Sequence, residues 1–379
     1  MKLVVFGLTV SSSFGNGHAT LWRGLIRALH RQGHRVLFFE KDLPWYAAHR
    51  DLHFLRDGEL VLYGDWPGIV WRAERELADA DVAIVTSYQP DAIAASEIVL
   101  ASPARRRLFY DMDTPVTLAR VARGEHVDYV HPRGLGEFDL VLSFTGGRAL
   151  ELLRTQLGAR RAAPLYGHVD PATHRPALPE MRFLGDFSYL GTYAPDRQEG
   201  VERLFFAAAR QRPAARFVLG GSLYPRGLEW PRNVFHMPHV APPDHPAFYA
   251  SSPLTLNVTR APMAALGWCP SGRLFEAAAC GVPVISDWWE GLDTFFLPEH
   301  EILVASSAQD VLDALARPAA DLARIGHAAR ERVLAEHTAE RRASELVALV
   351  ERLPELVAPA VPRAGSRAIA PGPAPRVPS

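Results

Sequence analysis

Short apolar runs alternate with helix-length segments along the whole chain, and this alternation restricts the fold more than any other feature. The runs at 2–7 (KLVVFG), 35–40 (RVLFFE) and 82–87 (VAIVTS) lack polar alternation, which is typical of strands buried on both faces of a parallel sheet. An amphipathic helix is expected over 18–31, between the first two runs. The pattern therefore predicts an α/β fold in which helices wrap parallel sheets. It also predicts strands at 107–111, 140–144, 187–191, 216–221, 233–237, 254–258, 282–286 and 301–306, and helices at 149–158, 197–212, 319–336 and 338–353.

The length of 379 residues suits two domains better than one. The stretch 163–181 contains four prolines and no sustained periodicity, which is typical of a connection between domains. We therefore expect two doubly wound, Rossmann-like domains that face each other across a cleft. The expected bounds are 1–165 for the amino-terminal domain, 166–185 for the linker, 186–357 for the carboxyl-terminal domain, and 358–379 for a disordered tail rich in Pro, Gly and Ala.

The composition excludes several classes of function. A net charge of −1 provides no basic surface for nucleic acid. Cys269 and Cys280 are the only cysteines, too few for a disulfide framework or a structural zinc site. The apolar start breaks into Ser and Gly without a cleavage pattern, and no segment reaches the roughly 18 apolar residues of a membrane helix. We expect a cytoplasmic protein without a cofactor, and the sequence leaves its oligomeric state open.

The stretch PSGRLFEAAACGVPVISD, residues 270–287, carries the strongest candidate site. A helix that starts near Ser271 offers free N–H groups and a positive dipole end to a phosphate, and Arg273 adds a forked donor. Glu276 lies one turn further on, where its carboxylate is suited to gripping two neighbouring ribose hydroxyls. The alternative interpretation is a surface ion pair between Arg273 and Glu276, three positions apart on one helix face.

RLFEAAACGVPVISD also resembles the EA-x-A-x-G-x-P-V-I signature of GT-B glycosyltransferases. The wider frame, together with YGHVDPATHRP and YLGTYAPDR, is similar to their spore-maturation-like (CgeB-type) group 1 branch, most specifically over about 185–335. The resemblance implies that the helix start meets the donor diphosphate and that Glu276 meets the ribose. The donor-binding residues that we expect are Gly191, Thr192, Arg197, Arg260, Ser271, Arg273, Glu276, Asp287 and Gly291.

Two positions on either side of this signature concern the transferred sugar and the diphosphate of the donor. Many retaining relatives carry a second acid eight residues before the ribose clamp, and here that position is Trp268, so the stereochemistry is left open. The stretch DWWEGLD, 287–293, resembles the loop whose backbone amides hold the diphosphate. One of Trp288 and Trp289 is expected either to wall the sugar or to pack in the core.

The amino-terminal half has two candidate loops. SSSFGNGHATLWRGL, 11–25, is a strand-to-helix loop without the full G-x-G-x-x-G pattern, and the resemblance places it at the acceptor. Asn16 and Gly17 would approach the acceptor, and His18 is expected to act either as a base or only as a helix cap. DMDTP, 111–115, ends a strand, so Asp111 or Asp113 should face the cleft as acceptor ligand or base. Thr114 is expected on the acceptor side of the cleft, and Thr114 and Pro115 shape the turn. We expect no metal at this pair, because two carboxylates alone make a weak divalent site.

These features predict a metal-independent glycosyltransferase that moves a sugar from a nucleotide-diphosphate donor to a hydroxyl-bearing acceptor. His18, Asp111 or Asp113 would supply a base if the enzyme inverts. The alternatives are a non-catalytic nucleotide-sugar-binding protein, which Trp268 favours, and a nucleotide-sugar 2-epimerase of the same fold. The base and sugar of the donor and the identity of the acceptor remain open.

Overall fold

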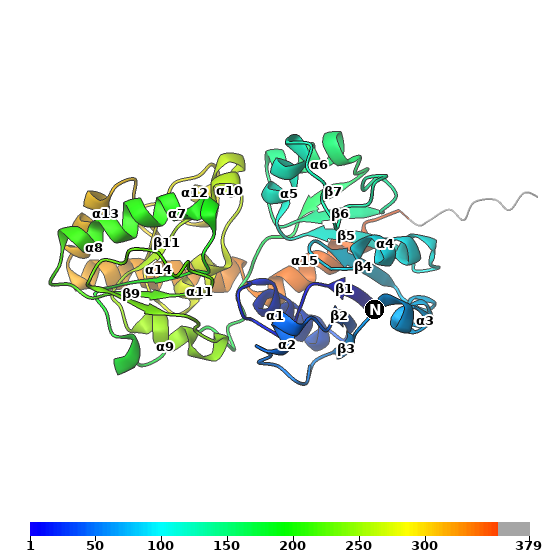
Figure 1. The fold of residues 1–379 in the computed structure, drawn as a ribbon, viewed down its shortest axis with the longest axis horizontal. Coiled ribbons are helices and arrows are strands. Elements are labelled where there is room, and N and C mark those ends of the chain that lie inside the picture. The colour runs from blue at the N-terminus through cyan, green and yellow to red at the C-terminus, as the bar shows by residue number, and fades with distance from the viewer. Residues whose placement is uncertain (355–379) are drawn as a thin grey trace, which may run out of the picture.

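The computed structural model describes residues 1–354, which form two sheets of parallel strands, each covered by helices on both faces (Figure 1). The first sheet has the strand order β3-β2-β1-β4-β5-β6-β7, and the second has the order β10-β9-β8-β11-β12-β13. Both orders reverse beside the first strand of the domain, which is the doubly wound topology. The predicted α/β class and the two Rossmann-like domains are confirmed. The tail expected at 358–379 lies outside the described residues.

The strands lie where apolar runs occur, and the helices fill the intervals. The amino-terminal elements are β1 (Lys2–Gly7), α1 (His18–Arg31), β2 (Arg35–Lys41), α2 (Pro44–Ala47), β3 (Glu59–Tyr63), α3 (Trp66–Leu77), β4 (Val82–Thr86), α4 (Ala92–Ala101), β5 (Arg106–Asp111), α5 (Thr114–Ala122), β6 (Leu140–Ser143), α6 (Arg148–Leu157) and β7 (Ala162–Pro164).

The second half repeats the alternation. Its elements are β8 (Phe187–Leu190), α7 (Pro195–Val201), a π-helical turn (Glu202–Phe206), α8 (Ala207–Gln211), β9 (Phe217–Gly220), β10 (Val234–Met237), α9 (His245–Ala250), β11 (Thr255–Asn257), α10 (Ala261–Leu266), α11 (Gly272–Ala279), β12 (Val284–Ser286), α12 (Leu292–Phe295), β13 (Leu303–Val304), α13 (Ala308–Leu315), α14 (Ala319–Glu336) and α15 (Ala339–Glu351). No helix in residues 1–354 is both long and apolar enough to cross a membrane.

Each sheet separates two apolar cores, because successive side chains of a strand point to opposite faces. In β1, for example, Val4 and Phe6 belong to one core, while Leu3 and Val5 belong to the other. Burial on both faces explains why the central strands read as uninterrupted apolar runs.

The helix α15, the last one in residues 1–354, returns to the first domain, which corrects the expected bounds of the second. Ala339, Ala343, Leu346 and Val350 of α15 lie in the same core as β1, and α15 packs beside α1 (Figure 1). The expected domain of 186–357 therefore ends earlier, near the end of α14. The helix α15, which fell within those expected bounds, instead packs its apolar face onto one side of the first domain.

Within residues 1–354 the chain thus crosses between the domains twice, and the two crossings pair with each other. Val169 in the linker donates its N–H to the His337 carbonyl at 2.9 Å, and Ala339 donates to the Val169 carbonyl at 2.8 Å. The buried Arg342 guanidinium also donates to the carbonyls of Tyr166 and Gly167, at 3.2 and 3.3 Å. These contacts join the linker to the segment between α14 and α15, so the two segments form one two-stranded connection between the domains.

Candidate active site

A cleft with a volume of about 470 Å³ lies between the domains and is lined by residues of both. In doubly wound sheets ligands bind at the carboxyl ends of the strands where the strand order reverses. Here those ends belong to β1 and β4 in the first sheet and to β8 and β11 in the second. The loops that follow these four strands all contribute to the cleft, through residues such as Asn16, Tyr88, Thr192 and Arg260. The two reversal points therefore face one another.

His18 and Asp113 meet on the amino-terminal wall of this cleft. The Nε2 of His18, the first residue of α1, lies 3.0 Å from Oδ2 of Asp113, which directly precedes α5. Both side chains line the cleft and both are largely buried. Nδ1 of His18 has no hydrogen-bond partner within residues 1–354. The arrangement gives a carboxylate–imidazole pair that can hold or accept a proton.

The pair is also linked to the opposite domain. Arg260, which follows β11, lies with Nη1 3.7 Å from Oδ1 of Asp113. The same guanidinium binds the Asp196 carboxylate, with its shortest contact at 2.8 Å. Arg260 therefore lies in the cleft as predicted, between one carboxylate of each domain.

Asp111 and Thr114 do not reach the cleft, which corrects two expectations. Asp111 ends β5 with no exposed surface, and its Oδ1 accepts the N–H of Asp113 at 3.1 Å. Burial raises the pKa of its carboxyl to about 6. Thr114 is also buried, and its hydroxyl contacts the Asp111 carbonyl at 3.1 Å and the Ser143 hydroxyl at 2.7 Å. Only Asp113 of the DMDTP stretch is positioned to meet a ligand.

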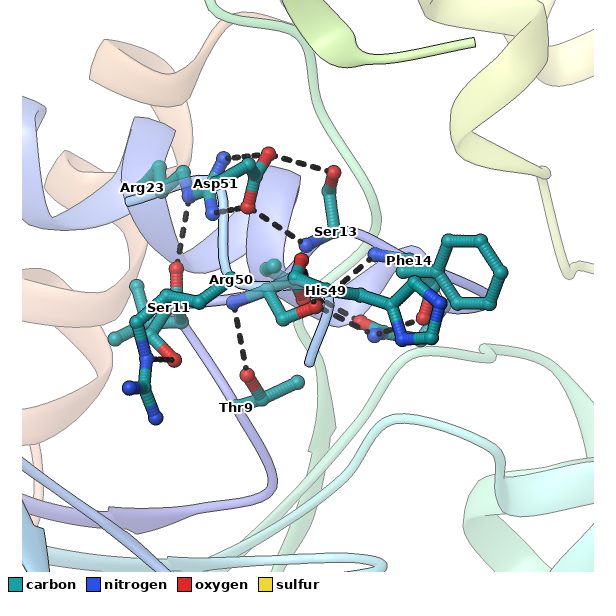
Figure 2. Close-up of polar contacts among 12 residues, drawn as sticks. Thr9, Ser11, Ser13, Phe14, Arg23, His49, Arg50 and Asp51 are labelled. Carbon is teal, nitrogen blue, oxygen red and sulfur yellow. Dashed lines mark hydrogen bonds and ion pairs between the residues drawn. The ribbon is translucent and has the colours of Figure 1, made fainter. Parts of the chain in front are cut away.

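The loop before α1 is held in place by two carboxylates. The buried Glu40 at the end of β2 accepts hydrogen bonds from the Val10 and Ser11 N–H groups at 2.7 and 2.9 Å. Figure 2 shows Asp51 between Ser13 and Arg23; it accepts from the Ser13 N–H at 3.0 Å and from Arg23 Nη2 at 2.6 Å. Because so many backbone groups are fixed, this wall of the cleft is formed before any ligand binds.

Asn16 and Gly17 lie on the cleft, as expected from the resemblance. Oδ1 of Asn16 accepts the N–H of Ala19 at 3.2 Å, and its Nδ2 donates to the carbonyls of Ser12 and Phe14. Asn16 therefore also caps the first turn of α1, which is the role that sequence reasoning offered as the alternative for His18. His18 makes no side-chain cap hydrogen bond.

On the carboxyl-terminal wall, α11 begins at the cleft. Ser271 and Gly272 line it, so the amino-terminal end of the helix, where backbone N–H groups lack intrahelical acceptors, adjoins the cavity. Arg273 points back toward the sheet, where Nη1 donates to Asn257 Oδ1 at 2.6 Å and Nε donates to the Leu190 carbonyl. Its Nη2 lies next to Gly191, where a Cβ would approach it to 2.9 Å.

Glu276 is not the surface partner of Arg273. Its nearest polar neighbours are the Tyr249 hydroxyl at 3.3 Å, His245 Nδ1 at 3.8 Å and His174 Nε2 at 3.9 Å. Burial by itself would raise the pKa of Glu276, but His174, His245 and Arg273 outweigh it and hold the pKa below its usual value. The side chain is 15% exposed and lines the cleft. The ion-pair alternative is therefore wrong, and an ionised carboxylate faces the ligand space.

The loop after β8 and the first turn of α7 carry three of the expected donor residues. Gly191, Thr192 and Arg197 all line the cleft, and Arg197 Nη1 donates to the Thr192 carbonyl at 3.1 Å. Nε of Arg197 is buried and has no partner in residues 1–354. This group is thus available to a ligand that approaches the loop.

Asp287 and Gly291 lie behind the cleft rather than on it. Asp287 accepts from the N–H and the hydroxyl of Thr259 at 2.9 and 3.0 Å, and so positions a residue that does line the cavity. Gly291, with φ of 90°, makes room for the Trp268 ring, because a Cβ there would lie 2.6 Å from its Cδ2. Of the two adjacent tryptophans, Trp289 is buried and Trp288 is 53% exposed, and neither lines the cleft.

Trp268 itself joins the two domains. Its carbonyl accepts the Gly146 N–H at 3.0 Å, and its own N–H donates to the Glu290 carbonyl at 2.7 Å. A Cβ on Gly147 would come within 2.4 Å of the indole Cδ1. The residue at the position of the missing acid is therefore a packing contact between the amino-terminal β6–α6 turn and the second domain.

Sequence reasoning missed His174, His245 and Tyr88. His174 lies in the proline-rich linker and His245 starts α9, so no local pattern connects them to Glu276. Tyr88 lines the cleft with a left-handed φ of 62°, a conformation that a bulky residue rarely adopts. The sequence indicated Tyr88 in one way: it is an aromatic residue directly after a predicted central strand, a position where binding residues are expected.

Comparison with known proteins agrees with this geometry. Residues 197–348 match a family model described as "Glycosyl transferase-like". The sucrose-phosphate synthase of Thermosynechococcus elongatus superposes with a TM-score of 0.68 at 15% identity, covering 93% of this chain and 98% of its own. The Anabaena protein HepE, solved with UDP and glucose, gives 0.65 at 15% identity, covering 93% and 99%. The chain has the GT-B fold.

A third solved structure extends the GT-B comparison. It is an alpha-glucosyltransferase in complex with UDP-glucose and DNA, with a TM-score of 0.64 at 12% identity over 93% of this chain and 98% of its own. No curated protein matches the sequence significantly. The match to the family model includes most of the carboxyl-terminal domain, which carries α11 and Glu276.

Proposed function

We propose that this chain is a glycosyltransferase that moves a sugar from a nucleotide-diphosphate donor to a hydroxyl-bearing acceptor. The observation that carries the proposal is that one cleft has candidate donor-binding groups on one wall and a candidate base on the other. One wall presents the start of α11 and the Glu276 carboxylate, and the other presents the His18–Asp113 pair. The structural neighbour HepE has been solved with UDP and glucose and with UDP-glucose, so a UDP-sugar is the first donor to test.

The donor would bind along the carboxyl-terminal wall. The first N–H groups of α11, near Ser271, and the unpartnered Nε of Arg197 would meet the diphosphate, where hydrogen bonds to anions are strong. The Glu276 carboxylate would accept hydrogen bonds from the ribose hydroxyls. Within the GT-B fold this assignment matches the spore-maturation-like branch, which we propose as the nearest family for the chain.

Transfer would need a base for the acceptor hydroxyl. In the proposed step the acceptor oxygen bonds to the anomeric carbon while the bond from that carbon to the diphosphate oxygen breaks. The acceptor proton passes to the His18–Asp113 pair, and the negative charge on the leaving diphosphate is met by Arg197 and the start of α11. Direct displacement of this kind inverts the anomeric centre, so NMR of the product anomer tests it.

The chemistry as proposed uses no divalent cation at DMDTP. Two observations support this proposal: Asp111 has no exposed surface, and Asp113 contacts His18. Charge on the donor would instead be met by arginine and by the helix start. The acceptor that we propose is a glycan or other hydroxyl compound rather than nucleic acid, since the chain carries a net charge of −1.

A ligand panel tests the proposal directly. UDP-, dTDP- and GDP-sugars should be compared by thermal shift, since a ligand at a hundred times its dissociation constant stabilises by about 2.7 kcal/mol. The best binder should then release its sugar slowly to water and faster to an acceptor, followed by chromatography. Binding without any release would support the non-catalytic alternative that Trp268 favours, and a 2-epimerised nucleotide sugar would support the epimerase. Absence of binding by the whole panel would refute the proposal.

A further inference from the structure

Three potential metal ligands from distant parts of the chain converge beside the cleft. His174 comes from the linker, His245 from the start of α9, and Glu276 from α11, and their ligand atoms all lie within 4.8 Å of one another. We propose that these three residues form a binding site for a borderline divalent transition-metal cation, of which Zn²⁺ is the natural probe.

The separations suit such a cation. His174 Nε2 lies 3.1 Å from His245 Nδ1 and 3.9 Å from Glu276 Oε1, and His245 Nδ1 lies 3.8 Å from Glu276 Oε2. Two ligands of a tetrahedral zinc ion, each about 2.0–2.1 Å from the metal, lie about 3.4 Å apart. The observed distances bracket this value, so small side-chain rotations bring all three ligands into range.

The backbone orients one of the two histidines for ligation. His245 Nε2 donates to the Val240 carbonyl at 3.2 Å, which leaves the Nδ1 lone pair directed at the other two residues. Metal-binding histidines are commonly fixed by such a hydrogen bond from the second ring nitrogen. His174 has a fully buried side chain whose Nδ1 has no partner in the part of the chain that the structure describes. Its proton can thus reside on Nδ1 when Nε2 binds a metal.

Ligand type selects the metal. Two imidazole nitrogens and one carboxylate suit Zn²⁺, Co²⁺ or Ni²⁺ and suit Mg²⁺ poorly, because magnesium prefers an octahedron of oxygens. His174 closes the inner side of the site, whereas His245 and Glu276 line the cleft. A water molecule can therefore complete the coordination from the cleft.

One consequence rests on the proposed function, although metal binding itself does not. If Glu276 grips the donor ribose, a cation on the same carboxylate competes with the donor. Zinc would then inhibit transfer reversibly, and saturating nucleotide sugar would weaken zinc binding.

The first experiment measures binding by the full chain without an affinity tag. Titration of Zn²⁺ against a chromophoric chelator should give one ion per chain, and Co²⁺ should give the visible absorption of a tetrahedral site with nitrogen and oxygen ligands. The Co²⁺ spectrum needs no variant and so does not depend on the folding of a mutant. A stoichiometry near zero, or an octahedral Co²⁺ spectrum, would overturn the proposal.

Variants locate the ion. His174→Gln and Glu276→Gln should each weaken Zn²⁺ binding at least tenfold, whereas His327→Gln should not change it, because His327 is a 70% exposed histidine on α14. Equal affinities in all three variants would place the ion elsewhere and sink the proposal. The competition is tested separately, by repeating the zinc titration with saturating donor. If the zinc affinity is the same with and without saturating donor, zinc and donor do not compete. Donor binding measured without zinc tests the proposed function separately.

Discussion

His18 and Asp113 are 95 positions apart in the sequence and 3.0 Å apart in the structure, on the wall of the cleft that faces α11. The contact exists because β1 and β5 end at the same edge of the first sheet, where α1 and α5 begin. The contact also distinguishes Asp113 from Asp111, two acids between which the sequence could not choose a base. Asp113 joins the pair, whereas Asp111 turns into the core.

The first prediction compares these two acids. Asp113→Asn removes the carboxylate from the His18 pair, so turnover should fall by about 10²- to 10⁴-fold, the usual contribution of a positioned base. Asp111→Asn should reduce turnover by less than about tenfold, because its side chain does not reach the cleft. Steady-state rates with the preferred donor measure both. A loss of similar size in the two variants would contradict the assignment of the base.

The second prediction concerns the pH dependence of stability. The pKa of Asp111 is raised to about 6 in the folded protein from 3.8, so the folded state keeps a proton that the unfolded state loses. Stability should therefore fall by about 3 kcal/mol as the pH rises through this window. Asp111→Asn removes this loss, so its melting temperature relative to wild type should be higher at pH 8 than at pH 4. Asp128→Asn, at a 79% exposed position, should show no such trend.

The third prediction tests the ribose contact. Glu276→Gln replaces an ionised acceptor by an amide, so charge-assisted hydrogen bonds of about 1.5–3 kcal/mol are weakened. Donor affinity measured by calorimetry should fall by about ten- to a hundredfold. Equal affinities of wild type and variant would take Glu276 out of the donor site.

The fourth prediction concerns the contact between the domains at Trp268. Gly147→Ala places a methyl group 2.4 Å from the indole Cδ1 and should destabilise the protein through both overpacking and a positive φ. Gly124→Ala shares the positive φ but meets no atom within 4 Å. The first variant should thus lose about 1–3 kcal/mol more than the second in denaturant unfolding. Equal losses of unfolding free energy in the two variants would show that the Trp268 ring moves aside without an energetic cost.

The fifth prediction separates the DMDTP stretch from metal chemistry. Treatment with EDTA should leave donor turnover intact, and it should raise turnover in a preparation that carries zinc. If Mn²⁺ or Mg²⁺ were needed to restore activity after EDTA, a catalytic metal would have to be placed at Asp113.

The central strands were predictable from the sequence because burial on both faces requires uninterrupted apolar runs. β3 and β7 were missed, and both are the outermost strands of the first sheet. An edge strand has one partner and less burial, so ELVLY at Glu59–Tyr63 and AAP at Ala162–Pro164 carry a weak signal. The return of α15 could not be predicted, since its apolar face fits either domain by pattern alone.

Among the candidate site residues, His18, Asp113 and Ser271 lie next to strand ends or helix starts, and all three line the cleft. Their position follows from the local chain and from the rule that binding loops follow parallel strands. The contact of His174 with His245 spans 71 positions and depends on how the linker crosses between the domains. Nothing in the sequence near either histidine encodes that path.

The return of α15 to the first domain has a consequence for synthesis on the ribosome. The amino-terminal sheet is made first, but α15, which completes the core on one of its faces, follows the second domain in the sequence. Until α15 emerges, the apolar side chains that it covers in this core remain exposed, although the whole second domain has been translated. Chaperones that bind exposed apolar surface should therefore engage the nascent first domain for longer than the second.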